Sequence, residues 1–363
     1  MKNFKNFLNR RLFLKSSLQV LLSQILTFSF LKSARAGGFL PFAFLKQSAP
    51  MANGSRGIFA GGDTASGNLS AIEYITFTTP GNPLSYGSLS VNRGGNLSGT
   101  SNASNGRGVF AGGYTTAGTN LIEYISLLIL GNASNFGTLT SAKCYVASHS
   151  NGTSNRGVIG GGTPTGMTAA DVNTIDYITI SVAGNATSFG TLDTPRDGQA
   201  GFSNGINNRG IFAGGTAAGS YPGGKAILYT TITTPSNSTS FGTSTTIHAY
   251  CGGLSNDINQ RGVIAGGGTA WNTTAVTNSI EYITISTTGN ATSFGTIATA
   301  KNVFSGTSNR TGNIGIFAGG MTSATFVATS TVSNIESITI STTGNASNFG
   351  QLTTAKFAFG ATS

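Results

Sequence analysis

The sequence has little of several residue types that carry chemistry or stabilise small folds. Its 363 residues include two cysteines, two histidines and one tryptophan, and only 8% of them are charged. The two cysteines, Cys144 and Cys251, exclude a disulfide framework, and no CxxC spacing typical of a zinc site occurs. There is no glycine-rich loop leading into a helix and no nucleophile elbow, so the common phosphate-binding and serine-hydrolase motifs are missing.

Acidic residues are missing from the first 36 positions, although these hold seven of the twenty lysines and arginines. In the rest of the chain thirteen basic residues stand against ten acidic ones, a net charge of +3. The total of +10 therefore reflects a basic start and does not predict a surface for nucleic acid.

Residues 1–36 have the order of an export signal: a basic start, an apolar stretch and a small-residue cleavage site. The run NRRLFLK, with Arg10 and Arg11 paired, resembles the twin-arginine signal. The apolar stretch 18–31 is shorter than the roughly 20 residues that span a bilayer, although a retained anchor is the alternative. The resemblance implies a mature chain that begins near Gly37 and is exported to the periplasm or the medium, with no stable membrane span after cleavage.

A short apolar run ending in two glycines recurs six times along the chain. The glycine doublets begin at 61, 112, 161, 214, 266 and 319, which defines six units of about 50 residues. Such a period is typical of propellers and solenoids, and it leaves residues 37–55 as a lead-in.

Each unit contains four runs rich in Ile, Val, Thr, Tyr and Phe, separated by Gly, Asn and Ser, which is the chemistry of strands and turns. Examples of the four are 303–308, 107–113, 280–287 and 186–192. Several runs are apolar on both faces, as expected of a sheet covered on both sides by its neighbours. We therefore predict an all-β fold, a radial stack of six four-stranded blades over residues 56–363.

The pattern within a unit resembles the kelch repeat. In the second unit the glycine doublet is followed by Glu123 and Tyr124, then by Phe136, Leu139 and Lys143. Phenylalanine or tyrosine stands where kelch repeats usually have tryptophan. The resemblance implies a six-bladed β-propeller similar to the central domain of galactose oxidase, and we expect a monomer.

The end of the chain predicts how the ring closes. The segment AKFAFGATS at 355–363 matches AKNVFSGTS at 300–308, which is the first strand of a unit, but no second strand follows it. We expect it to complete the blade that begins at Arg56 and so to remove an open sheet edge. Phe42 to Phe44 is the rival for the same place.

Several repeated positions are assigned to the scaffold. The acids Glu73, Glu123, Asp176, Glu281 and Glu336 share one position at the start of the third strand. The repeated arginines could form an anion-binding ring, but hydrogen bonds to carbonyls of the adjacent blade are favoured. The scaffold positions are Arg56, Gly61, Gly62, Arg107, Gly112, Gly113, Arg156, Gly161, Gly162, Arg209, Gly214, Gly215, Arg261, Gly266, Gly267, Gly319 and Gly320.

Function in a repeat fold is expected where the units differ, because loops tolerate substitution while strands must pack. The loops between second and third strands vary, and they open on the same face as the loops that connect one unit to the next. Aromatic and polar side chains there suit contact with a carbohydrate or a protein. The candidate binding residues are Tyr114, Asp171, Asp193, Arg196, Asp197, Tyr221, Lys225, Trp271 and Phe326.

An exported enzyme, either a hydrolase or a copper radical oxidase, is the alternative to a binding module. Kelch-type propellers include copper radical oxidases, which use two histidines, a cysteine-linked tyrosine and a second tyrosine. This chain has His149, His248, Cys144, Cys251, Tyr145 and Tyr250 near the innermost strands of two units. Their offsets from the following arginine differ, which does not place them at one depth, so we expect neither a metal nor a cofactor.

Overall fold

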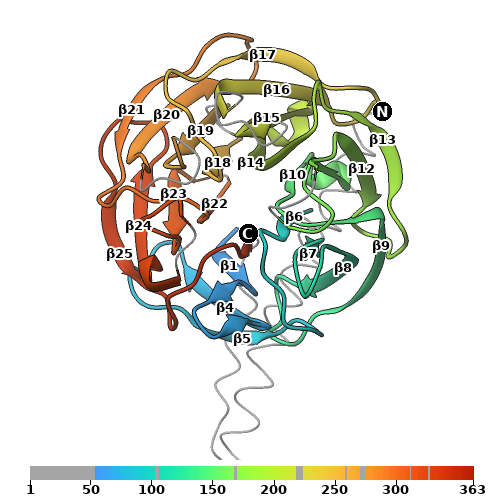
Figure 1. Ribbon diagram of the computed structural model, residues 1–363, viewed down its shortest axis with the longest axis horizontal. Helices are drawn as coiled ribbons and strands as arrows, with labels where there is room; N and C mark the ends of the chain where they lie inside the picture. The colour runs from blue at the N-terminus through green and yellow to red at the C-terminus, as the bar shows by residue number, and fades with distance from the viewer. Residues whose placement is uncertain are drawn as a thin grey trace, which may run out of the picture. The chain divides into compact units, whose positions relative to one another are not determined.

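The computed structural model describes residues 54–102, 106–166, 170–217, 224–257, 260–269, 275–310, 312–325 and 328–363. The predicted signal peptide and almost all of the lead-in lie outside these residues. The described residues form six four-stranded antiparallel sheets arranged around a central axis, as Figure 1 shows. The prediction of a six-bladed, all-β propeller is confirmed. None of the helices in the described ranges is long and apolar enough to cross a membrane.

We number the blades I to VI and give their strands from the axis outward. Blade I contains β26 (Gly360–Thr362), β1 (Arg56–Ala60), β4 (Ala71–Thr76) and β5 (Leu84–Ser88). Blade II contains β6 (Ser98–Ser101), β7 (Arg107–Ala111), β8 (Thr119–Ser126) and β9 (Ser134–Lys143). Blade III contains β10 (Ala147–Ser150), β11 (Arg156–Gly160), β12 (Thr174–Thr179) and β13 (Thr187–Thr191).

Blades IV to VI repeat this plan. Blade IV contains β14 (Arg196–Ser203), β15 (Arg209–Ala217), β16 (Ala226–Thr231) and β17 (Thr239–Thr243). Blade V contains β18 (Gly252–Asn256), β19 (Arg261–Ala265), β20 (Ser279–Thr284) and β21 (Thr292–Thr296). Blade VI contains β22 (Ser305–Ser308), β23 (Ile314–Ala318), β24 (Asn334–Thr339) and β25 (Ser347–Gln351). The remaining elements are β2 (Asp63–Thr64), β3 (Gly67–Asn68) and the short 3-10 turns η2 (Gly152–Ser154), η3 (Gly205–Asn207) and η5 (Ala328–Ser330).

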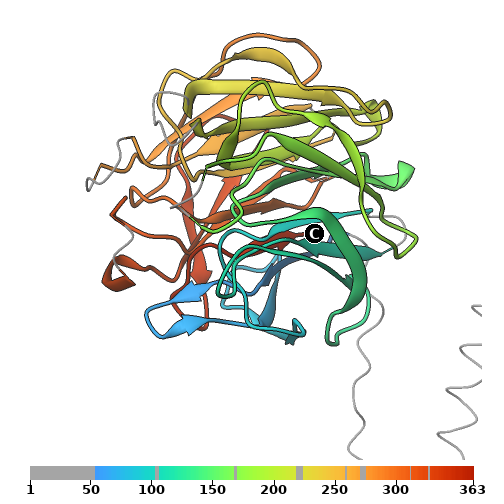
Figure 2. The ribbon, with the colours of Figure 1, turned by 45° about the vertical axis from the view of Figure 1, so that its right-hand side comes forward.

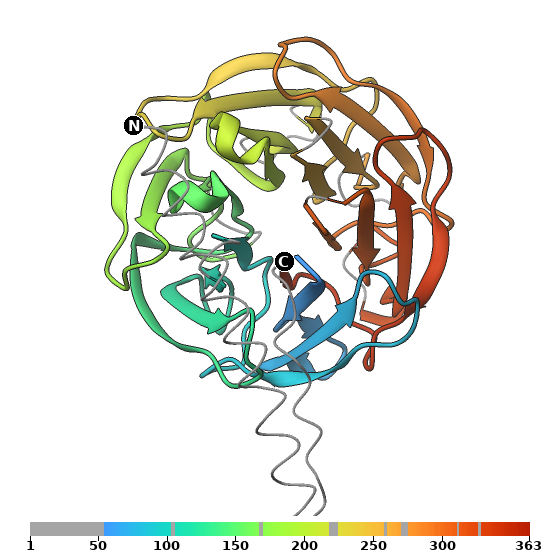
Figure 3. The same cartoon turned by 180° about the vertical axis from the view of Figure 1, so that it is seen from behind.

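Blade I is built from both ends of the ring. Strand β26 pairs antiparallel with β1, with Ile58 opposite Thr362 and Ala60 opposite Gly360. Figure 3, seen from behind, shows the last strand beside the first ones near the axis. The expected closure by the C-terminal segment is therefore confirmed over the rival at 42–44.

The hydrophobic core lies between neighbouring blades. The cluster between blades II and III, for example, joins Phe136 and Leu139 of one blade to Ile159 and Ile178 of the next, all at most 3% exposed. The oblique view in Figure 2 shows the sheets facing one another around the ring. Because each sheet is covered on both faces, both parities of its strands are apolar.

The glycine doublets end the second strands at points where a side chain would collide with backbone. Gly112 has φ 69°, and a Cβ there would lie 2.7 Å from the carbonyl oxygen of Lys143. Gly113 has φ 103°, and its Cβ would lie 2.8 Å from the oxygen of Gly94. Only glycine combines this backbone conformation with such close approach, so the doublet turns the chain into the next loop.

The repeated arginines hold neighbouring blades together. The guanidinium of Arg107 lies 4.2 Å from the ring centroid of Tyr124 in its own blade, and its Nη1 donates to Ile180 O of the next blade at 3.0 Å. Arg156, Arg209 and Arg261 make the same two contacts. Each guanidinium is thus occupied by a ring and by backbone acceptors of the adjacent blade.

Candidate functional site

The variable loops and the loops between blades lie on one face, which we call the variable-loop face. Isolated β-bridges join the two kinds of loop in five places. The pairs are Asp63 with Phe357, Gly94 with Tyr114, Cys144 with Thr163, Ala249 with Gly268 and Asn302 with Met321. Each bridge fixes the start of a variable loop against the loop that leads into an innermost strand.

Six equivalent residues on this face form a ring of backbone hydrogen bonds around the axis, which we call the axial ring. All six have φ between 53° and 61°: Gly95, Tyr145, Gly198, Tyr250, Val303 and Ala358. The Tyr145 N–H donates to Gly95 O at 2.6 Å. Each following member of the ring donates in the same way to the carbonyl of the member before it, as far as Ala358. The Ala358 carbonyl accepts from Asn96 N, next to Gly95, which closes the ring. A left-handed backbone costs about 1–3 kcal/mol at a non-glycine residue, so the closed ring must hold these residues in place.

Side chains at the axial ring fill the axis on this face. Cys144, Tyr145, Tyr250, Val303 and Met321 belong to one buried cluster, and the two tyrosine rings meet edge to face at 5.4 Å. Tyr114, a candidate binding residue, is half-buried and packs against the cluster. Within the channel lie two polar cavities of about 80 and 100 Å³, lined by the innermost strands.

Asp197 is the most deeply buried of the candidate binding residues, at 2% exposed. Its Oδ2 accepts from the Tyr250 hydroxyl at 2.9 Å, and its Oδ1 accepts from the Thr216 hydroxyl at 2.5 Å. The Thr216 oxygen lies 3.5 Å from a carboxylate oxygen of Asp171. Burial, together with the charge of Asp171, raises the pKa of Asp197 to about 7. The sequence-predicted Asp171 and Asp197 therefore form a coupled carboxyl pair.

Asp63 is a second buried carboxyl group on this face, and sequence analysis did not single it out. Its Oδ2 accepts from Gly95 N at 3.0 Å, while its Oδ1 is buried with no hydrogen-bond donor among the described residues. Burial raises its pKa to about 6, against the opposing effect of the Gly95 N–H. A Cβ at position 94 would lie 1.6 Å from Oδ1, so Gly94 makes room for the carboxyl group. The signal in the sequence was its position directly after a glycine doublet.

The two carboxyl groups act on the same tyrosine. Burial raises the pKa of Tyr145 well above its usual range, and the nearby Asp63, Cys144, Asp197 and Tyr114 raise it further. An acid of blade I, Asp63, and an acid on β14 of blade IV, Asp197, thus both raise the pKa of one tyrosine at the axis.

The remaining candidates are less closely grouped. Arg196 is buried, and its Nε pairs with the Asp193 carboxylate at 3.0 Å, with 40% of the Asp193 side chain exposed. Burial would raise the pKa of Asp193, but the contacts from Arg196 and Thr194 lower it on balance. Lys225 is exposed. Tyr221, Trp271 and Phe326 lie outside the described residues.

The repeated acids form buried pairs with basic residues. Each base precedes the innermost strand of a blade, and each acid lies on the third strand of that same blade. The pairs are Arg93–Glu123 (2.7 Å), Lys143–Asp176 (3.1 Å), His248–Glu281 (3.3 Å), Lys301–Glu336 (2.7 Å) and Lys356–Glu73 (2.8 Å). Burial lowers the pKa values of Lys143, Lys301 and Lys356, which the facing carboxylates partly offset. In blade IV the buried Leu228 replaces the acid, and Arg196 turns to Asp193 instead.

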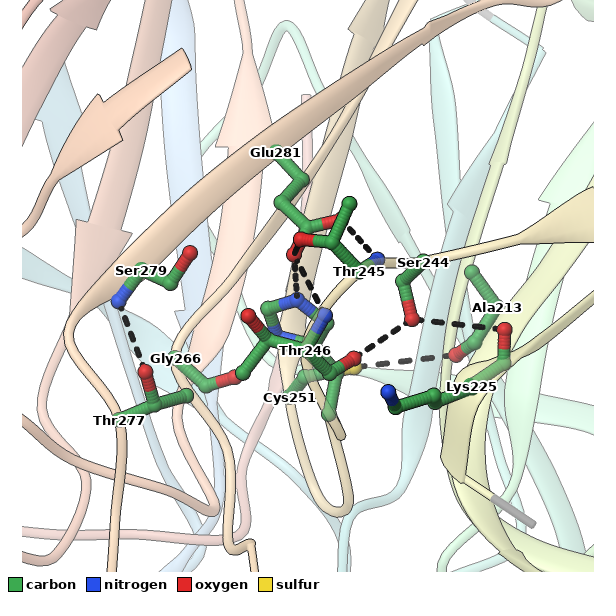
Figure 4. Close-up of polar contacts among 11 residues, drawn as sticks. Ala213, Lys225, Ser244, Thr245, Thr246, Cys251, Gly266, Thr277, Ser279 and Glu281 are labelled. Carbon is green, nitrogen blue, oxygen red and sulfur yellow. Dashed lines mark hydrogen bonds and ion pairs between the residues drawn. The ribbon is translucent and has the colours of Figure 1, made fainter. Parts of the chain in front are cut away.

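The pair in blade V uses a histidine, and Figure 4 shows its surroundings. Glu281 accepts from the Thr245 N–H, the Thr245 hydroxyl and the Thr246 N–H at 2.9, 2.6 and 2.9 Å. His248 places Nδ1 2.6 Å from Gly266 O and Nε2 toward Glu281. Burial alone would raise the pKa of Glu281, but the hydrogen bonds from His248 and Thr245 lower it to about 2.

The residues considered for copper chemistry lie in different environments. The His149 ring lies tilted against the Phe212 ring, with the centroids 4.6 Å apart, and its Nε2 shares a hydrogen bond with the Thr230 hydroxyl at 3.0 Å; burial lowers its pKa to about 3. His248 faces Glu281. Cys144 and Cys251 are both buried and free. Within the described part of the chain, no three or more His, Cys, Asp or Glu side chains gather in a way that could hold a metal ion.

No family model matches the chain, and no curated protein matches it.

Proposed function

We propose that this protein is an exported, kelch-like propeller that binds a carbohydrate through its variable-loop face. The export part rests on the Arg10–Arg11 signal, and the kelch relationship rests on the order of glycine doublet, acid, tyrosine and aromatic in each unit. The strands repeat almost unchanged while the loops on this face differ in every blade. Such a division is typical of a repeat scaffold that presents a binding surface.

The observation that carries the proposal is the coupled pair Asp171 and Asp197, with the half-buried Tyr114 on the same face. Carboxyl groups accept hydrogen bonds from sugar hydroxyls, and a tyrosine offers an apolar ring with a polar end. Asp171 is only partly buried, so its carboxylate is the member of the pair within reach of a ligand.

Binding is favoured over catalysis by the contacts of Asp197. Both of its oxygens are engaged, one by Tyr250 and one by Thr216. The axis beside it is filled by the buried Tyr145 and Tyr250.

The test is a glycan array probed with the chain from Gly37 onward and with two variants, Tyr114→Ala and Asp171→Asn. Binding of a defined set of glycans is expected, and each variant should weaken it about tenfold or more, because each removes a contact worth about 1.4 kcal/mol. Ile206→Ala is the matched control, since Ile206 is 62% exposed on η3 at the opposite face.

Two results would count against the proposal. If no glycan on the array is bound, the ligand is not a carbohydrate. If the parent captures a protein from culture supernatant and both variants fail to capture it, the ligand is a protein. If both variants bind as the parent does, the variable-loop face is not the contact surface.

A further inference from the structure

Blade VI breaks the repeat at the two positions that join neighbouring blades. In the other five blades an arginine opens the second strand and lies 4.2–4.7 Å from the centroid of a tyrosine ring on the third. Blade VI has Ile314 in place of that arginine and Ser337 in place of that tyrosine. We call this arginine–tyrosine pair the clamp, and the contact between two neighbouring blades a seam. The seam between blades VI and I lacks the clamp.

The clamp satisfies a particular pair of backbone acceptors in the next blade. Arg156 Nη1 donates to the carbonyls of Ile232 and Thr233 at 3.3 and 2.7 Å. Arg209 does the same to Ile285 and Ser286 at 3.1 and 2.8 Å. These carbonyls lie where the third strand passes into its outer turn.

Two other seams have the same donor. Arg107 donates to Ile180 O, and Arg261 donates to Ile340 O. Between blades I and II, Arg56 lies 4.7 Å from the centroid of the Tyr74 ring, but its Nε and Nη1 are buried without a hydrogen-bond partner among the described residues. Four of the six seams thus supply an arginine donor to these turn carbonyls.

At the seam between blades VI and I the equivalent acceptors are the carbonyls of Phe77 and Thr78. No side chain among the described residues donates a hydrogen bond to either. In place of the clamp there is a cavity of about 480 Å³, whose walls include Phe77, Thr78, Ile314, Ser337 and Phe349.

We propose that this seam is a binding site for a guanidinium group, namely an arginine side chain supplied by a partner polypeptide. The arginine occupies the place that Arg156 and Arg209 fill in their own seams and donates to the carbonyls of Phe77 and Thr78. A planar guanidinium presents several donors in a fixed fork, so it spans two neighbouring carbonyls better than the single ammonium of lysine. The site lies at the outer turns of the blades, separate from the variable-loop face.

The first experiment titrates the isotope-labelled protein with N-acetyl-arginine methylamide and follows the backbone amide signals of Thr78 and Thr79. Saturable shifts at these amides are expected, because their peptide groups contain the accepting carbonyls. N-acetyl-citrulline methylamide has the same shape without the charge, and the lysine analogue has the charge without the fork. Both should bind about tenfold more weakly or worse, the loss expected from one hydrogen bond.

The second experiment fills the site with side chains of the protein itself. The double variant Ile314→Arg/Ser337→Tyr restores the side chains of the other blades, and it should lose the response to the arginine probe. Equal shifts with the citrulline analogue, shifts away from the seam, or an undiminished response of the double variant would each overturn the proposal. The comparison of the three probes on the parent protein needs no variant, so it stands even if the double variant fails to fold.

Discussion

Replacing Lys301 with methionine should destabilise the propeller by about 3–5 kcal/mol, the usual cost of breaking a buried ion pair from one side. Lys301 Nζ lies 2.7 Å from Glu336 Oε2, and both side chains are at most 2% exposed. The variant leaves the Glu336 carboxylate buried with only the Ala298 N–H at 2.6 Å and the Asn334 amide at 3.0 Å. Two neutral donors do not replace the lost positive charge.

The double variant Lys301→Met/Glu336→Leu should recover most of that loss, because it removes the stranded charge and fills the space with apolar atoms. Blade IV already has a buried leucine, Leu228, in the position of the acid, while its base, Arg196, pairs with Asp193. The Ala298 N–H loses its acceptor, but Ala298 is exposed, so water can take over.

The assay is urea unfolding at pH 7, monitored by far-UV circular dichroism. The midpoint and the slope of the unfolding transition are compared across the variants. Lys225→Met is the matched control, since Lys225 is exposed, and it should stay within about 0.5 kcal/mol of the parent. A loss below about 1 kcal/mol for Lys301→Met, or a double variant as unstable as the single one, would refute the reasoning.

Three further predictions concern pH and ring closure. Burial, together with the charge of Asp171, raises the pKa of Asp197 from its usual 3.8 to about 7, so its contribution to stability is full below pH 4 and lost as pH rises through 7. In urea unfolding, the stability of Asp197→Asn relative to the parent should therefore rise between pH 4 and 7, and a constant difference over that range would contradict the high pKa. His149 has a native pKa of about 3 against 6.5, so its contribution is present above pH 6.5 and lost as pH falls toward 3. His149→Gln should flatten that slope by about 1.4 kcal/mol per pH unit, and an unchanged slope would show that another group titrates. Truncation after Lys356 removes β26 and the contact of Phe359 with Phe59, so the single cooperative thermal transition should disappear; a transition like the parent's would mean that β26 is dispensable.

The repeat made the scaffold predictable from the sequence. Units of near-constant length fix the number of blades, and the match of 355–363 to 300–308 predicts which strand completes blade I. Both inferences use local similarity, which needs no knowledge of contacts between units. The antiparallel pairing of β26 with β1 confirms the second of these inferences.

The contacts across blades could not be predicted in the same way. Lys143 was visible as a repeated base, yet its pairing with Asp176 depends on how far one blade is rotated against the next. The axial ring was hidden for another reason: Tyr145 and Val303 adopt a left-handed backbone that such residues rarely accept. Glycine at the two equivalent positions 95 and 198 was the available signal. Asp63 was overlooked because its burial comes from Gly94 in a different loop.

The axial ring divides the variable-loop face into parts that can be exchanged and parts that cannot. Each inter-blade loop passes a hydrogen bond to the next, so a change of length in one of them disturbs the whole circle. The loops between second and third strands lie outside this circle. Five of them meet the inter-blade loops at isolated bridges, and the Asp63 carboxylate also accepts from Gly95 N in the ring. New binding specificities can therefore be built by replacing the loops between second and third strands one blade at a time, while the axial ring is left unchanged.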